Sequence, residues 1–230
     1  MDAAYARAMV TDEVLARVEE RLCAALGEPD ARASVTFLGT DRIEVLRFRD
    51  TPGRDTAGGA GHGTEADGAE GRDTAGPLVR YATLGMSAQP MTDPAAALAD
   101  PVRGPRAELL LSLRAGLADT DQVLRPLAVL AASPQVEGVV VAPGSALDLG
   151  APLWPGAPFT AVLVAEPGGL VEDLDLPAPM DPVRFLPLLP MTPNEAAWKR
   201  VHGAAALHAR WLAHRVDLRA PFRRSVPLDD

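Results

Sequence analysis

Two apolar segments, both predicted to be β-strands, constrain the fold of this chain most strongly. The first spans Leu78 to Ser87 (LVRYATLGMS) and runs directly into a Gly-Met-Ser turn without an intervening polar loop. The second spans Ala107 to Arg114 (AELLLSLR). Short apolar runs bounded by glycine, proline and polar residues are typical of buried strands. We therefore expect a β-sheet at the centre of the fold.

Length and composition indicate one soluble domain. The chain has 230 residues, 47% of them hydrophobic, and a chain of this size buries about 70% of its unfolded surface around one core. Its only cysteine, Cys23, has no partner for a disulfide. We find no secretory signal in the first residues and no apolar run near the roughly 20 residues that cross a bilayer.

The chain contains one lysine, one isoleucine and one asparagine: Lys199, Ile43 and Asn194. These three residue types have AT-rich codons, so their rarity indicates a GC-rich bacterial genome. We therefore expect a protein of the bacterial cytoplasm.

The first part of the chain predicts a helix followed by two strands. Thr11 can cap a helix with apolar residues at helical spacing that ends at Gly27. Residues 34–38 and 42–48 are typical of strands. In the second strand the apolar alternation changes phase after Val45, which predicts either a bulge or burial on both faces.

Residues 50–76 differ in kind from the rest of the chain. Their only apolar residues are alanines, and the hexapeptide GRDTAG occurs twice, at Gly53 and again at Gly71. Ordering such a segment would cost about 1 to 2 kcal/mol per residue with no apolar burial in return. We predict a disordered insert. Its glycines do not match a phosphate-binding loop, because no strand leads in and no helix follows.

The second half alternates strands and helices and closes on a well-marked helix. Thr192 as N-cap, Pro193 at the first helical position and Glu195 three residues after the cap form a capping box, and apolar residues continue to Val216. The earlier elements are a helix at 121–132 and strands at 136–142, 160–165 and 185–189. Pro126 either lies in the first turn of that helix or bends it. Pro187 predicts an edge position for the last of these strands.

This order of elements favours an α+β (mixed α/β) fold over a regular βαβ repeat. We expect a single domain with a central mixed β-sheet flanked by helices. Residues 1–30 are predicted to form an N-terminal helix that packs on the core, residues 31–216 the main domain and residues 217–230 a C-terminal tail.

Residues that commonly carry chemistry are isolated in this sequence. His202, His208 and His214 are six apart, so successive histidines are rotated by about 240° around a helix and cannot share one face. No metal site or cofactor is predicted. Ser145 follows a predicted strand but lacks the Gly-x-Ser-x-Gly frame of a nucleophile elbow, and no basic residue that could activate Cys23 is evident. A small hydrolase built on the Ser145 loop remains the alternative function.

Charge is unevenly distributed along the chain. The net charge of −9 disfavours binding to nucleic acid or to an anionic membrane. Residues 199–224 carry seven bases and one acid, whereas residues 166–181 carry five acids and no base. Glu172, Asp173 and Asp175 belong to the acidic stretch, which is either a solvated rim or a face that steers a basic partner.

Five motifs follow one another along the chain: Tyr81–Ser87 (YATLGMS), Glu108–Leu111 (ELLL), Pro143-Gly144, Pro152–Ala161 (PLWPGAPFTA), and Phe185–Thr192 (FLPLLPMT) with Glu195. In this order they resemble the suppressor-of-fused domain family over roughly residues 33–213, and we call them the family landmarks. The chain departs from the family pattern in two places: the duplicated insert, and Ser145, where many bacterial relatives have histidine after Pro-Gly.

The resemblance implies a non-enzymatic protein-binding domain with a mixed α/β sheet. Bacterial single-domain members are often regarded as immunity proteins that neutralise a toxin of a polymorphic toxin system, and the acidic stretch suits a basic toxin encoded nearby. A regulatory protein that binds another partner is the other role that the resemblance implies. The oligomeric state is left open. The candidate partner-binding residues are Tyr81, Met86, Trp154, Glu172, Asp173 and Asp175; for Met86 and Trp154, which lie at turns, core packing is the other interpretation.

Overall fold

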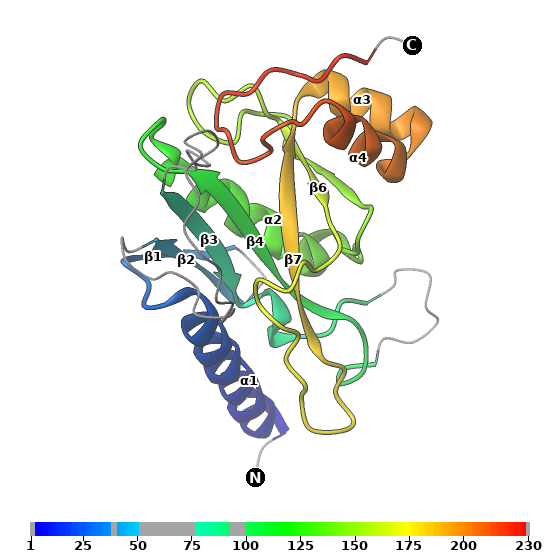
Figure 1. Cartoon of the computed structure of the whole chain (residues 1–230). Helices are drawn as coiled ribbons and strands as arrows, with labels where there is room; N and C mark the ends of the chain where they lie inside the picture. The colour runs from blue at the N-terminus through cyan, green and yellow to red at the C-terminus, as the bar shows by residue number, and fades with distance from the viewer. Residues whose placement is uncertain (1–2, 38–40, 51–76, 93–99, 229–230) are drawn as a thin grey trace, which may run out of the picture.

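The protein is built around one seven-stranded mixed sheet (Figure 1). The computed structural model describes residues 3–37, 41–50, 77–92 and 100–228. The strands lie in the order β1-β2-β3-β4-β7-β6-β5, and neighbours are antiparallel except for the parallel pair β4 and β7. The strands are β1 (Ala31–Thr36), β2 (Arg42–Arg49), β3 (Leu78–Leu84), β4 (Arg106–Arg114), β5 (Ala146–Asp148), β6 (Ala161–Val164) and β7 (Val183–Met191).

Helices cover both faces of the sheet. In Figure 1, α2 lies behind the strands, while α1 and the α3–α4 pair lie at opposite ends of the molecule. Side chains alternate accordingly along β7: Leu186 and Leu188 join the α2-side core, whereas Phe185 joins the α1-side core. The helices are α1 (Ala3–Leu26), α2 (Leu124–Glu137), α3 (Pro193–His202) and α4 (Ala204–Ala213), with short 3₁₀ turns η1 (Met86–Ala88) and η2 (Thr120–Val123). This arrangement confirms the predicted α+β fold with a central mixed sheet flanked by helices.

Strand β2 shows why the apolar alternation changed phase. Its pairing with β1 and β3 runs without interruption, so no bulge is present in it. Ile43 and Val45 pack in the α2-side core, whereas Leu46 and Phe48 pack in the α1-side core. Of the two alternatives left open by the sequence, burial on both faces is therefore the correct one.

The edge position predicted for the strand around Pro187 is wrong. Strand β7 lies between β4 and β6. The ladder with β6 covers Leu188 to Met191, so it does not include Pro187. The ladder with β4 covers Val183 to Leu188, so it does not include Pro190. Each proline therefore lies where one of the two ladders has already stopped, and its missing N–H removes no ladder hydrogen bond.

Three predicted element boundaries also need correction. Helix α1 begins at Ala3, so Thr11 is an interior residue and not the cap; the alanine-rich start favours helix. The predicted strand at 136–142 is not formed, because α2 continues to Glu137 and ends at Gly138, which adopts a φ of 68°. The single final helix is divided at Gly203, where φ is 88°.

Helix α2 begins at Leu124, so Pro126 lies in its first turn. The predicted insert falls almost entirely outside the described residues, and the domain boundaries stay predictions. Within the described ranges, no helix combines the length and hydropathy that a membrane span requires.

Candidate functional site

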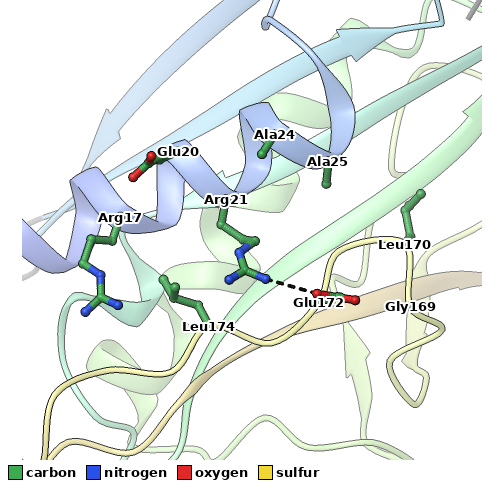
Figure 2. Close-up of a pocket in the computed structure, with 9 residues that line it drawn as sticks. All are labelled: Arg17, Glu20, Arg21, Ala24, Ala25, Gly169, Leu170, Glu172 and Leu174. Carbon is green, nitrogen blue, oxygen red and sulfur yellow. Dashed lines mark ion pairs between the residues drawn. The ribbon is translucent and has the colours of Figure 1, made fainter.

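The loop that joins β6 to β7 runs along α1 and forms a groove with it. We call Glu166–Asp181 the acidic loop. The groove has a volume of about 660 Å³ and is lined by Arg17, Glu20 and Arg21 from the helix and by Leu170 and Glu172 from the loop (Figure 2). Glycine at position 169, with φ 75°, helps the loop to turn at the groove.

The acidic loop is anchored at several points. Val171 and Leu174 are buried in the α1-side core. The Leu174 and Val183 backbones exchange two hydrogen bonds of 2.9 Å, and Arg17 Nη2 donates to the Asp175 carbonyl oxygen at 2.8 Å. The loop therefore presents its exposed side chains from a fixed backbone.

The three candidate acids of the loop all lie on the surface. The Glu172 side chain is 85% exposed and faces Arg21 at 3.6 Å, as Figure 2 shows. Asp173 lies 3.8 Å from Arg184, and Asp175 is exposed. The arginines neutralise part of the charge, so this surface is less acidic than the linear sequence suggests. Arg17 and Arg21 were missed by the sequence analysis; their spacing of four residues on one helix face was the available signal.

The other three candidates are buried. Tyr81 is fully buried, and its hydroxyl lies 2.7 Å from Thr120 Oγ1 and donates to Asp121 Oδ1 at 2.9 Å. Burial, above all, raises the Tyr81 pKa. Met86 and Trp154 are each 2% exposed, and the Trp154 ring packs edge-on against Phe159 with centroids 5.7 Å apart. In this conformation these three side chains pack in the core, away from the acidic loop's exposed carboxylates.

Two family landmarks meet at a buried carboxylate, which we call the Glu108 socket. Glu108 is 0% exposed. It accepts hydrogen bonds from Thr83 Oγ1 (2.6 Å), the Gly85 amide (2.9 Å), and the Ser87 amide (3.0 Å) and hydroxyl (2.6 Å). Burial raises the Glu108 pKa, although the bonds from Ser87 and Thr83 oppose the rise. The Gly-Met-Ser turn is thus held by the glutamate of the ELLL strand.

Another landmark forms the Glu195 socket. Thr192 and Glu195 make the predicted capping box, with Thr192 N donating to Glu195 Oε2 at 2.9 Å. Glu195 also accepts from Trp211 Nε1 at 3.0 Å, Val226 N at 3.1 Å, and both Arg223 terminal nitrogens at 2.7 and 3.0 Å. Burial alone would raise the Glu195 pKa, but the bonds from Arg223 and from the Thr192 amide outweigh it and hold the pKa below its usual value. This socket fixes the chain after α4 to the rest of the fold.

In the part of the chain that the structure describes, no hydrogen bond joins Ser145, Cys23 and the histidines to one another. Ser145 lies in a turn, where its hydroxyl accepts a long 3.4 Å bond from Ala142 N. Burial raises the pKa of the half-buried Cys23 thiol, which keeps it protonated. His202 stacks on Trp198 with ring centroids 4.0 Å apart. In the described part of the chain, no group of three or more His, Cys, Asp or Glu side chains is placed to hold a metal.

The sequence matches the family model described as Suppressor of fused protein (SUFU) over residues 39–224. No curated protein sequence matches this chain. The three solved structures described next are at most 16% identical to this chain, so they show likeness of fold alone.

Three solved structures are similar to this one. A protein described as a suppressor-of-fused homologue from Neisseria gonorrhoeae FA 1090 has a TM-score of 0.62 and 16% identity, with 93% of this chain and 96% of that chain covered. A chain of the Sufu–Fu complex has a TM-score of 0.58 and 12% identity, with 92% and 91% covered. Drosophila Suppressor of Fused has a TM-score of 0.56 and 14% identity; 91% of this chain matches 50% of that one.

Proposed function

Because this chain belongs to the suppressor-of-fused family, we propose that it is a non-enzymatic, cytoplasmic protein of the immunity type, which neutralises a partner protein by binding it. Protein binding is supported by the Sufu–Fu complex, which contains a chain of the same fold. The observation in this molecule that carries the proposal is the acidic loop, fixed to the core beside a groove along α1.

The proposed partner surface is basic and carries an apolar side chain. Glu172, Asp173 and Asp175 are exposed on the loop, where they can steer a basic partner toward the groove. Leu170 is 43% exposed at the groove edge and can contact an apolar residue. Since the loop backbone is already anchored, binding would cost little ordering entropy. A basic toxin encoded beside this gene fits this description.

Co-expression tests the neutralising role. Cells that express the neighbouring toxin should survive when the wild-type protein is present, and the purified pair should associate faster at low salt than at high salt. Survival without detectable association, or association without salt dependence, would contradict the proposal.

A charge-matched pair of variants tests the loop itself. Glu172, Asp173 and Asp175 are replaced together by lysine, and the control carries lysine at Asp12, Asp119 and Glu137, which are also exposed. Both variants change the net charge by the same amount. We expect the loop variant to slow association at least tenfold at low salt, with the control much closer to wild type and both melting near the wild-type temperature. Equal slowing in the two variants would assign the effect to net charge and remove the loop from the interface.

A further inference from the structure

A second cavity, apolar in character, lies further toward the N-terminus of α1. It has a volume of about 320 Å³, within the lower range of small-molecule pockets. Val10 and Thr11 of α1 form one wall, Pro101 and Val102 a second, and Met180 of the acidic loop a third. Arg106, at the start of β4, also lines it.

Arg106 is a buried cation in this cavity. The residue is 4% exposed. Its Nη1 donates to the carbonyl oxygens of Ser87 and Ala88 at 2.7 and 3.0 Å, and Nη2 donates to the Val102 carbonyl oxygen at 3.2 Å. Among the described residues, Nε has no hydrogen-bond partner and no carboxylate forms an ion pair with the guanidinium.

This arrangement is electrostatically incomplete. The acid that acts on Arg106 from a distance, Asp181, already accepts a hydrogen bond from the Gly104 amide at 2.6 Å. Three neutral carbonyls do not supply the negative charge that a buried cation requires, and an unpaired buried charge costs several kcal/mol. Burial correspondingly lowers the Arg106 pKa. An anion that reached Nε and Nη2 would remove this cost.

We propose that this cavity is a binding site for a ligand that joins an apolar chain to a carboxylate. The apolar chain would occupy the space between Val10, Val102 and Met180, and the carboxylate would pair with Arg106. The Nε–Nη2 edge of a guanidinium matches the two oxygens of a carboxylate. A monoanion balances the single positive charge, whereas a phosphate dianion would leave excess charge in an apolar cavity. We expect the carboxylate to replace the Val102 contact, the longest of the three.

Calorimetric titration with octanoate, octan-1-ol and acetate tests the chemistry. Octanoate should bind saturably with one site per chain, octan-1-ol at least tenfold more weakly, and acetate not detectably at millimolar concentration. Octanol that binds as tightly as octanoate, or octanoate that fails to bind, would overturn the proposal.

Variants test the location. Thr11→Trp should fill the cavity and abolish octanoate binding, whereas Ala16→Trp, on an exposed position of the same helix, should leave binding unchanged. Arg106→Gln should reduce octanoate affinity to that of octanol; if this variant does not fold, Thr11→Trp alone decides the location. Unchanged binding by folded Thr11→Trp protein would refute the site.

The same ligand chemistry occurs in fatty acids and at the C-terminus of a polypeptide. A peptide that ends in Ala-Leu-Val, with a free or an amidated C-terminus, distinguishes the two sources. If octanoate and the peptide with a free C-terminus bind but the amidated peptide does not, the natural ligand is a chain terminus. If octanoate binds and neither peptide does, the natural ligand is a free acid. Both results require the site. These titrations use no protein partner, so their outcome is independent of the immunity proposal.

Discussion

The buried pair of Glu195 and Arg223 should behave as one thermodynamic unit. Glu195 is 0% exposed, the Arg223 side chain is 5% exposed, and their closest N–O distance is 2.7 Å. Arg223→Met removes two of the hydrogen bonds to the carboxylate and leaves the charge buried with only neutral donors, Thr192 N, Trp211 Nε1 and Val226 N. Removal of one partner from such a pair costs about 3 to 5 kcal/mol.

Substitution of the other partner, Glu195, should cost a similar amount of unfolding free energy. Glu195→Gln preserves shape but leaves the Arg223 guanidinium without its carboxylate, so we again expect about 3 to 5 kcal/mol. The double variant has no unpaired charge. Its loss should therefore fall short of the sum of the single losses by about 2 to 3 kcal/mol.

Urea unfolding of the four proteins, followed by tryptophan fluorescence, measures this cycle. Because the Glu195 pKa is lowered on folding, the stability from its ionised form is present above its usual pKa of 4.5 and is lost as pH falls through the folded value. The cost of Glu195→Gln should shrink over that acidic range. Single losses that add within about 0.5 kcal/mol at pH 7 would show that the two residues act independently and refute the reasoning.

Two other predictions concern the Glu108 socket. Gly85 has φ 129°, and a Cβ placed there would lie 2.6 Å from the Arg42 carbonyl oxygen, so Gly85→Ala should cost about 1 to 3 kcal/mol in urea unfolding, and a neutral result would mean that the turn can relax. The Glu108 pKa is raised on folding, so the stability of the wild type relative to Glu108→Gln should be greatest below pH 4.5 and should fall as pH rises through the folded pKa. Parallel stability–pH curves for the two proteins would contradict this prediction.

Local signals in the sequence predicted much of the fold. The capping box at Thr192 was recognised because it depends on residues three apart, and the strand containing Tyr81 because its apolar run is short and bounded. The break at Gly203 was missed because the apolar residues continue on both sides of it. The central place of β7 was missed because a proline fits a central strand only where one of the neighbouring ladders has stopped. The extent of the two ladders cannot be predicted from the sequence around Pro187.

The candidate site was less predictable because its parts are distant in sequence. Arg17 reaches the backbone of Asp175 across 158 positions, and no local pattern records such a contact. Glu108 offered a weak signal: a single carboxylate within an otherwise apolar run has to be compensated if that run is buried. Met86 and Trp154 are buried, which agrees with core packing, the second interpretation that the sequence left open for these two residues.

Both carboxylate sockets lie inside the protein, and this determines what genetic data on such positions can reveal. Alanine scanning at Glu108 or Glu195 would lower the amount of folded protein, and a binding assay would register that loss as a defect in recognition. Solved structures that are only 12 to 16% identical to this chain have a similar fold, so most positions of the sequence differ between proteins of this fold. Because both sockets are buried, a partner-binding site has to be located by substitutions at surface positions.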